Sequence, residues 1–244
     1  MASDRMLRWM CWALAVLAVV SAVASLLLVF NLWAGGPTEP DSTADLPARL
    51  EVFRGNDQEI FGMVLLSSVA ALLAFVLVGL IGVALRAYAA AGPMRDAMVT
   101  LLVLAAGVGI VGQIFSAGVA QAASYGYCDC GFKTEELIGQ DYALSLGFTL
   151  VNWLTNAAFV LTGLGLWVAG RLVNVSSIWR MLSYLIAAIL VVAGIVRLAA
   201  PVFYFPEIAF QGSDAAIGLT LAILVPIWAI LLTRGSSMSR SAAG

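Results

Sequence analysis

Two cysteines separated by a single residue, Cys128-Asp129-Cys130, are the most reactive local pattern in this sequence. Thiolates are nucleophiles and ligands for soft metals, so the pair is compatible with redox chemistry through a strained disulfide or with a copper(I) or zinc site. For a metal, the chain supplies only Asp129 and neighbouring carboxylates as further ligands, and a complete site would require another chain. The remaining interpretation is a connecting loop whose cysteines pair with a partner or with nothing. Cys128 and Cys130 are therefore redox or disulfide candidates, and we predict no metal site and no cofactor.

A second candidate is a row of small polar side chains within the apolar stretch 141–171. Its amides are Asn152 and Asn156, and Thr155 and Thr162 flank them. The row shares one helical face, because its members follow one another at spacings of four, three, four and seven residues: Ser145, Thr149, Asn152, Asn156 and Gly163. An amide that faces lipid costs free energy, so the row is predicted to face other helices or a water-filled cavity.

Two further amides, Gln113 and Gln121, lie in the preceding apolar stretch. Together with Asn152 and Asn156 they could form a hydrogen-bonded amide cluster between the two helices. In the structural interpretation these amides hold the helices together, each hydrogen bond contributing about 0.6–2 kcal/mol. In the functional interpretation they form a polar lining for a small ligand or for water. The sequence leaves both interpretations open.

Arg197 is the one charged residue inside an apolar stretch, three residues before the predicted end of that stretch at Ala200. An intramembrane cation indicates a functional site by default, although an arginine at this depth can also snorkel to the surface. Its candidate partners are acidic residues on the same predicted side of the membrane: Glu59, Asp141, Glu207 and Asp214. A structural ion pair and a ligand anchor both remain open. The predicted ligand-binding set is Gln113, Asn152, Asn156 and Arg197.

Several chemistries are excluded by residue types that the sequence lacks. It contains no histidine, which excludes haem ligation by imidazole, histidine-based metal sites and histidine as a general base. Its single lysine, Lys133, lies in a polar connection and cannot hold retinal as an intramembrane Schiff base. No Walker loop, metalloprotease motif or pair of intramembrane carboxylates is present. These absences favour a non-enzymatic protein.

Membrane-spanning helices must position these residues. The chain is 62% hydrophobic and 11% charged, whereas about a quarter of the residues in a soluble domain are charged. Its apolar residues gather into six stretches, each near the roughly 20 residues that a helix needs to cross a bilayer. We predict an all-α, polytopic six-helix membrane bundle with spans at about 9–33, 58–88, 96–123, 142–168, 178–200 and 214–233.

The connections complete this predicted single domain of residues 1–234. Two long connections, 35–57 and 124–141, are expected on one side of the membrane, with a short surface helix within 46–53 and one helical turn at 134–138. Pro226 is expected to kink the last span. Residues 235–244 are expected to form a disordered cytoplasmic tail.

The distribution of charge predicts the orientation. Eight arginines fall at the two termini and in the two short links: Arg5, Arg8, Arg86, Arg95, Arg171, Arg180, Arg234 and Arg240. The long connections are mainly acidic. The positive-inside rule therefore predicts a multi-pass protein of the cell membrane with both termini in the cytoplasm and the Cys128–Cys130 pair on the exoplasmic side. Cys11 lies in the opposite half of the bilayer and is expected to pack in the core.

Gly107-Val-Gly-Ile-Val-Gly112 has the glycine spacing of a dinucleotide-binding fingerprint, but it lies inside a spanning helix rather than after a strand. Close helix packing is the better interpretation. The small residues form one face that lets another backbone approach: Ala105, Gly109, Gly112, Ser116 and Ala120.

The segment Gly163-Leu-Gly-Leu-Trp-Val-Ala-Gly-Arg171, followed by Ile178-Trp-Arg-Met-Leu182, resembles the corresponding region of a group of uncharacterised six-span bacterial membrane proteins that share a domain of unknown function. The resemblance implies the same six-helix layout and adds no catalytic residue.

Three functions are therefore open. The first is a non-enzymatic subunit or scaffold that associates with a membrane protein partner or with its own copies, through the small-residue face and the outer connections. The second is a carrier or receptor for a small neutral or anionic molecule, bound between the third, fourth and fifth spans. The third is an exoplasmic thiol-redox or soft-metal protein. The expected surroundings are the lipid bilayer, and no nucleic-acid partner is expected.

Overall fold

The computed structural model describes residues 2–29, 46–126, 134–203 and 207–241, and every regular element in these ranges is helical. The elements in chain order are α1 (Ala2–Val29), α2 (Leu46–Leu85), the short helix η1 (Arg86–Tyr88), α3 (Pro93–Gly126), α4 (Thr134–Leu172), α5 (Ser177–Phe203), α6 (Glu207–Leu219), the π-helical segment η2 (Thr220–Leu224) and α7 (Val225–Ser241). Helix α6, the segment η2 and helix α7 follow one another without a break and form the last span.

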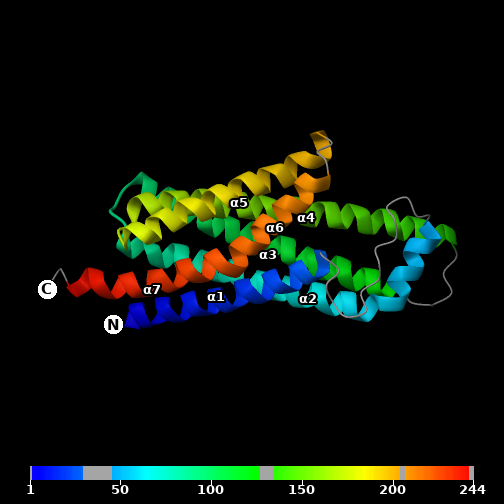
Figure 1. The fold of residues 1–244 in the computed structure, drawn as a ribbon, viewed down its shortest axis with the longest axis horizontal. Helices are drawn as coiled ribbons and strands as arrows, with labels where there is room; N and C mark the ends of the chain where they lie inside the picture. Colours follow the sequence, from blue (N-terminus) through cyan, green and yellow to red (C-terminus); the bar gives the residue numbers. More distant parts are fainter. Residues whose placement is uncertain (1, 30–45, 127–133, 204–206, 242–244) are drawn as a thin grey trace.

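Six of the described helical segments are long and apolar enough to cross a bilayer, which confirms the predicted six-helix membrane bundle. The segments are Arg5–Leu27, Gly62–Tyr88, Pro93–Val119, Thr149–Leu172, Ser177–Ala199 and Gly212–Arg234. All of them lie along the long axis of the molecule, and the two chain ends lie at the same end of the bundle (Figure 1). The chain is thus an integral, multi-pass membrane protein.

The spans form a ring in chain order. Close backbone approaches join α1 to α2, α2 to α3, α3 to α4, α4 to α5 and α5 to α6, and α1 closes the ring against α6, η2 and α7. Because each helix packs mainly on its two neighbours, the inward faces of the spans can surround a central space. This ring is the feature of the fold that creates the candidate site.

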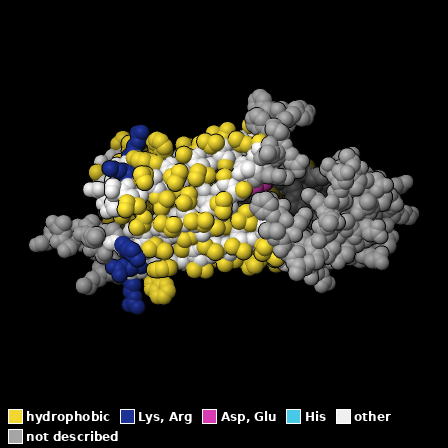
Figure 2. Space-filling view, viewed as in Figure 1, with side chains coloured by type: hydrophobic (Ala, Val, Ile, Leu, Met, Phe, Trp, Pro, Cys, Tyr) yellow, Lys and Arg dark blue, Asp and Glu magenta, His cyan; other side chains and the backbone are white. Residues whose placement is uncertain are grey.

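The described arginines are distributed unevenly along the bundle. Apolar side chains cover most of the described surface on the visible side, and the visible arginine side chains gather at one end (Figure 2). We call this end the arginine-rich end; its arginines are Arg5, Arg8, Arg86, Arg95, Arg171, Arg180 and Arg234. The opposite end is called the Asp214 end. The separation matches the pattern from which the orientation was predicted.

The second, fourth and last helices extend farthest beyond the predicted spans. The second begins at Leu46 rather than about residue 58. Pro47 stands in its first turn, where the missing N–H breaks no hydrogen bond, and no further proline interrupts the helix before Gly62. The fourth begins at Thr134, where the one predicted helical turn continues directly into the span; Glu135 and Glu136 there favour a helix N-terminus. The last helix continues to Ser241, into the segment expected to be disordered.

Glycines set the closest helix contacts. A Cβ at Gly109 would lie 2.5 Å from Phe75 Cγ on α2, and a Cβ at Gly112 would lie 3.1 Å from Leu154 Cβ on α4. A Cβ at Gly163 would lie 2.9 Å from the carbonyl oxygen of Ala187 on α5. The small-residue face of α3 therefore serves close packing, as predicted, and its partners are helices of the same chain.

The last span departs from regular α-helix directly before Pro226. Within η2, the N–H of Val225 donates to the carbonyl oxygen of Thr220, five residues earlier. Proline has no N–H to donate, and its ring collides with the carbonyl group four residues earlier in a regular helix. The wider π turn accommodates that conflict where a kink was predicted.

Candidate ligand-binding site

A cavity of about 730 Å³ occupies the centre of the ring. Its walls come from all six spans, and its size falls within the range of small-molecule pockets, roughly 300–1,000 Å³. The four predicted ligand-binding residues, Gln113, Asn152, Asn156 and Arg197, all line it. The cavity is thus shared by α3, α4 and α5, as expected, and also by α1, α2 and the last span.

Arg197 is held by two neighbouring helices. Its Nη1 donates to Asp214 Oδ2 of α6 at 2.8 Å, and its Nη2 donates to Asn152 Oδ1 of α4 at 3.1 Å. The two charged side chains are 21% and 27% exposed, so the ion pair is mostly withdrawn from the surface. Among the four acidic candidates, Asp214 is the one whose side chain the structure describes, and its ion pair gives the arginine a structural role and still leaves it on the cavity wall.

Asn152 and Asn156 extend this network along α4. Asn156 Nδ2 donates to Asn152 Oδ1 at 2.8 Å and to the Asn152 carbonyl oxygen at 2.7 Å. Asn152 Oδ1 thus accepts hydrogen bonds from both the arginine and the second amide. Asn156 is buried, with 4% of its surface exposed. We call these four residues, Asp214, Arg197, Asn152 and Asn156, the Arg197 network.

Gln113 takes a different partner from the one predicted. Its Nε2 donates to Thr155 Oγ1 at 3.2 Å, and no bond to Asn152 or Asn156 occurs among the described contacts. Gln121, the other expected member of an amide cluster, is exposed. The rotation of α3 against α4 decides this, because it directs Gln113 to the threonine that flanks the row. The expected four-amide cluster is therefore replaced by an amide–hydroxyl contact and a separate asparagine pair.

Serine hydroxyls complete the polar wall and, apart from Ser116 of the small-residue face, were not singled out from the sequence. Ser68 donates to Ser116 at 2.9 Å between α2 and α3, and the hydroxyls of Ser25 and Ser67 lie 2.7 Å apart between α1 and α2. Ser67 also donates to the carbonyl oxygen of Ser21 at 3.3 Å. All five serines line the cavity. The available signal was the spacing of serines within apolar spans, four residues apart in α1 and adjacent in α2.

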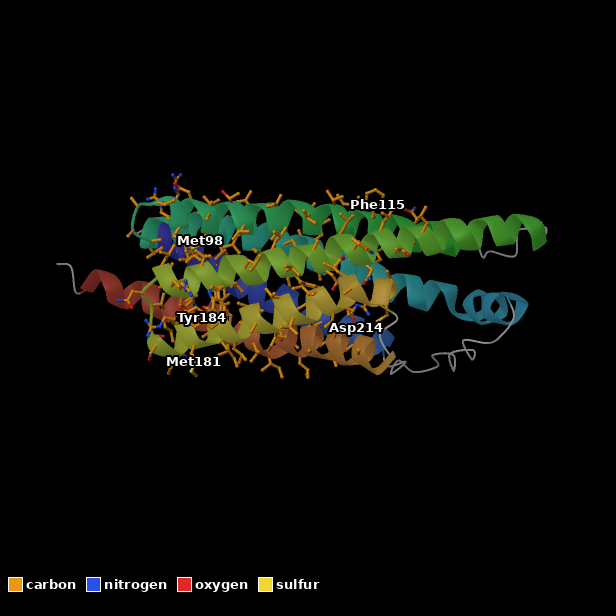
Figure 3. All side chains as sticks on the ribbon, turned by 90° about the horizontal axis from the view of Figure 1, so that it is seen from above. Met98, Phe115, Met181, Tyr184 and Asp214 are labelled. Atoms are coloured by element: carbon orange, nitrogen blue, oxygen red, sulfur yellow. The ribbon has the colours of Figure 1, made fainter. Side chains whose placement is uncertain are left out.

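The cavity wall changes character along the membrane normal. Its polar groups lie toward the Asp214 end, at the level of the Arg197 network. Toward the arginine-rich end the wall is aliphatic and aromatic: Leu14, Ile81, Leu85, Leu102, Leu166, Leu190 and Trp228. Asp214 lies near one end of the bundle, whereas Met98, Met181 and Tyr184 lie toward the other (Figure 3). The site therefore has a polar half and an apolar half.

The apolar half of the wall includes one member of a buried aromatic pair, Trp228. The rings of Trp179 and Trp228 stack with centroids 5.6 Å apart, and Trp228 Nε1 donates to Ser183 Oγ at 2.8 Å. Ser183 in turn donates to the carbonyl oxygen of Trp179 at 2.9 Å. This pair fixes the position of the Trp228 ring, the aromatic side chain that the last span contributes to the cavity wall.

One hydroxyl on the cavity wall lacks a hydrogen bond. Thr162, on α4 between the polar and the apolar half, is 7% exposed, and its Oγ1 has no hydrogen-bond partner. A buried hydroxyl without a partner costs free energy. Thr162 is therefore a polar group that a bound molecule could satisfy.

The cysteine candidates stand apart from this site. Cys128 and Cys130 lie outside the described residues. Cys11 is a free, fully buried thiol in the core, as expected for a packing residue. Within the described ranges, no three acidic or cysteine side chains come together in a group that could hold a metal ion.

Comparison of the chain with protein-family models, with curated proteins and with solved structures finds no match. The resemblance of the segment 163–182 to six-span bacterial membrane proteins thus stays a prediction, and the chemistry of the cavity is the basis for assigning a function.

Proposed function

We propose that this integral membrane protein is a carrier or receptor that binds a small molecule inside its ring of helices. The observation that carries the proposal is the central cavity of about 730 Å³, whose wall contains the Arg197 network and Gln113. A cluster of polar groups on the wall of an otherwise apolar pocket is the usual composition of a small-molecule site.

The energetics of packing support an occupied cavity. A dry void lined by apolar side chains is unfavourable, because the atoms that line it lose van der Waals contacts. Water can fill the polar half, where it finds several hydrogen-bonding partners. It is poorly suited to the apolar half, since genuinely apolar cavities stay dry. A molecule with an apolar part is the occupant that fits both halves.

One of the two surfaces of the scaffold hypothesis, the small-residue face of α3, is used within the chain; its other surface, the outer connections, includes residues outside the described ranges. Gly109 and Gly112 of the small-residue face approach Phe75 and Leu154 of the same chain, so that face is not free for a partner. The thiol-redox hypothesis depends on Cys128 and Cys130, which lie outside the described residues. The carrier or receptor is therefore the proposal with support from described geometry.

The test is to purify the protein in a mild detergent, extract it with organic solvent and quantify the small molecules that accompany it by mass spectrometry. A variant with a filled cavity, Ala18→Phe, should lose the bound compound, because Ala18 is buried on α1 and lines the cavity. The matched control is Ala13→Phe on the exposed face of the same helix.

We expect the wild type and Ala13→Phe to carry the same compound in near-stoichiometric amount, and Ala18→Phe to carry at least about ten-fold less, which corresponds to 1.4 kcal/mol. Bulk lipid should be equal in all three preparations. A compound profile that is identical in the three proteins would refute the proposal.

A further inference from the structure

We infer that the ligand is an uncharged amphiphile, with its polar headgroup at the Arg197 network and its hydrocarbon chain directed toward Trp228. This inference rests on the proposed binding function and adds the chemical class and the orientation of the molecule. Three observations carry it: the charge balance of the site, the hydrogen-bonding groups of its polar half and the distance from the Arg197 network to Trp228.

Among the described side chains, the cavity wall carries no net charge. The guanidinium of Arg197 is neutralised by Asp214 at 2.8 Å, and both groups line the cavity. An anionic headgroup would have to compete with Asp214 for the arginine, and a cationic headgroup would have to compete with the arginine for Asp214. In either case one charge would remain buried without compensation, which is strongly unfavourable in a water-poor site. An uncharged headgroup leaves the ion pair intact.

The polar half supplies hydrogen bonds for such a headgroup. Gln113 uses one of its amide N–H groups on Thr155, and Asn152 accepts two hydrogen bonds through its oxygen. Each residue therefore retains amide groups on the cavity wall that can donate to a hydroxyl or carbonyl oxygen. Thr162, nine-tenths buried and without a partner, adds a hydroxyl farther along the cavity. This set suits an alcohol or an ester better than a bare hydrocarbon.

The distance from the Arg197 network to Trp228 suits a long hydrocarbon chain. Trp228 follows Asp214 by fourteen residues in the last span, which corresponds to about 20 Å along a helix axis. The wall between these levels includes Leu166, Leu190 and Val225. A hexadecyl chain has about this length when extended. Burial of such a chain is favoured by its apolar area, and Trp228, stacked on Trp179, lines the cavity toward the arginine-rich end.

The experiment uses three probes with one shared tail. Hexadecanol, hexadecanoate and hexadecyltrimethylammonium, each brominated at the tail end, are added to the purified full-length protein in nanodiscs, at a pH at which the carboxylate is ionised. Bromine quenches tryptophan fluorescence on contact. Quenching in the wild type minus quenching in Trp228→Phe isolates the contact at the apolar end of the cavity, because both proteins keep the lipid-facing tryptophans.

The expected result is saturable quenching of Trp228 by the brominated alcohol, with half-saturation at an at least ten-fold lower concentration than for either charged probe. An alcohol brominated next to the headgroup should leave Trp228 unquenched. Competition by unlabelled dipalmitoylglycerol would identify a bilayer lipid as the source of the uncharged headgroup, and competition by unlabelled hexadecanol alone would identify a free alcohol.

Charge variants provide a second measurement on the same probes. Asp214→Asn leaves an arginine without its counterion and should shift the preference from the alcohol to the carboxylate by at least ten-fold. Arg197→Gln should shift it toward the ammonium probe. The wild-type comparison stands by itself if either variant fails to fold.

The outcomes separate the two proposals. If a charged probe binds as tightly as the alcohol, or if the headgroup-brominated alcohol quenches Trp228, the class or the orientation is wrong and the binding function survives. If no probe binds saturably and no compound is lost from Ala18→Phe, both proposals fail.

Discussion

Arg197 and Asp214 are joined by an ion pair of 2.8 Å across seventeen residues and a reversal of the chain, and the same arginine bonds Asn152, forty-five residues earlier. Three helices thus meet at one guanidinium on the wall of the cavity. This arrangement gives the pair a structural role and places it at the polar end of the candidate site, so its contribution to stability must be measured separately from binding.

Removal of either charge should destabilise the fold. For Arg197→Gln or Asp214→Asn we expect the free energy of unfolding to fall by about 2 kcal/mol, less than the 3–5 kcal/mol of fully buried pairs, because both side chains keep partial exposure. The double variant should be more stable than the sum of the single losses implies. Denaturation in mixed micelles measures all three. The matched control is Arg86→Gln, whose partner Asp96 lies 3.6 Å away at the surface, and no measurable change is expected there. Equal losses at Arg86 and Arg197 would contradict the structural role.

The contact between α2 and α3 should tolerate no side chain at Gly109. In Gly109→Ala the new methyl group would lie 2.5 Å from Phe75 Cγ, so the helices must separate, and we expect a loss of about 1–3 kcal/mol. Gly107→Ala is the control two residues away, because no atom lies within 4 Å of its Cβ position. Alanine there should be neutral or slightly stabilising through its helix propensity. The same unfolding assay compares them, and a larger loss at Gly107 would show that the packing of α3 has been assigned to the wrong face.

Two threonines of α4 should respond in opposite ways to valine. Thr155 accepts the hydrogen bond of Gln113, so Thr155→Val leaves a buried amide without its acceptor and should cost about 1 kcal/mol. Thr162 has no partner for its hydroxyl, so Thr162→Val should leave the stability of the ligand-free protein unchanged or raise it by up to about 1 kcal/mol. Thermal unfolding in the absence of added ligand measures both. A large loss at Thr162 would mean that its hydroxyl has a partner in the folded protein.

The predicted orientation can be tested through the cysteines. The arginines at the chain ends and short links predict that a membrane-impermeant maleimide labels Cys128 and Cys130 in intact cells, once a reductant has been added. Cys11 is fully buried and should remain unlabelled until the protein is denatured, which provides an internal control. If the double variant Cys128→Ser/Cys130→Ser is still labelled in intact cells, another thiol is exposed. If the native pair is labelled only in broken cells, the predicted orientation is wrong.

The bundle itself was predictable from the sequence, because apolar stretches of bilayer length must become helices whose backbone groups bond internally. An ion pair at Arg197 was one of the alternatives that the sequence left open, beside a ligand anchor and snorkelling to the surface, because a lone charge in lipid is costly. The inward direction of Asn152 and Asn156 followed from the same reasoning about amides. In each case the free-energy cost of exposing a polar or charged group to lipid favours an environment that supplies hydrogen bonds.

Tertiary structure alone decided which residues meet. Asp214 pairs with Arg197, and Gln113 bonds Thr155 rather than an asparagine, because helix rotation sets both contacts. The packing of α1 against the last span closes the ring and creates the cavity. The pattern of apolar residues in the sequence did not predict this packing. In a bilayer, helix faces that contact lipid and helix faces that contact protein are similarly apolar, so hydrophobicity does not distinguish them and the detailed packing of side chains does.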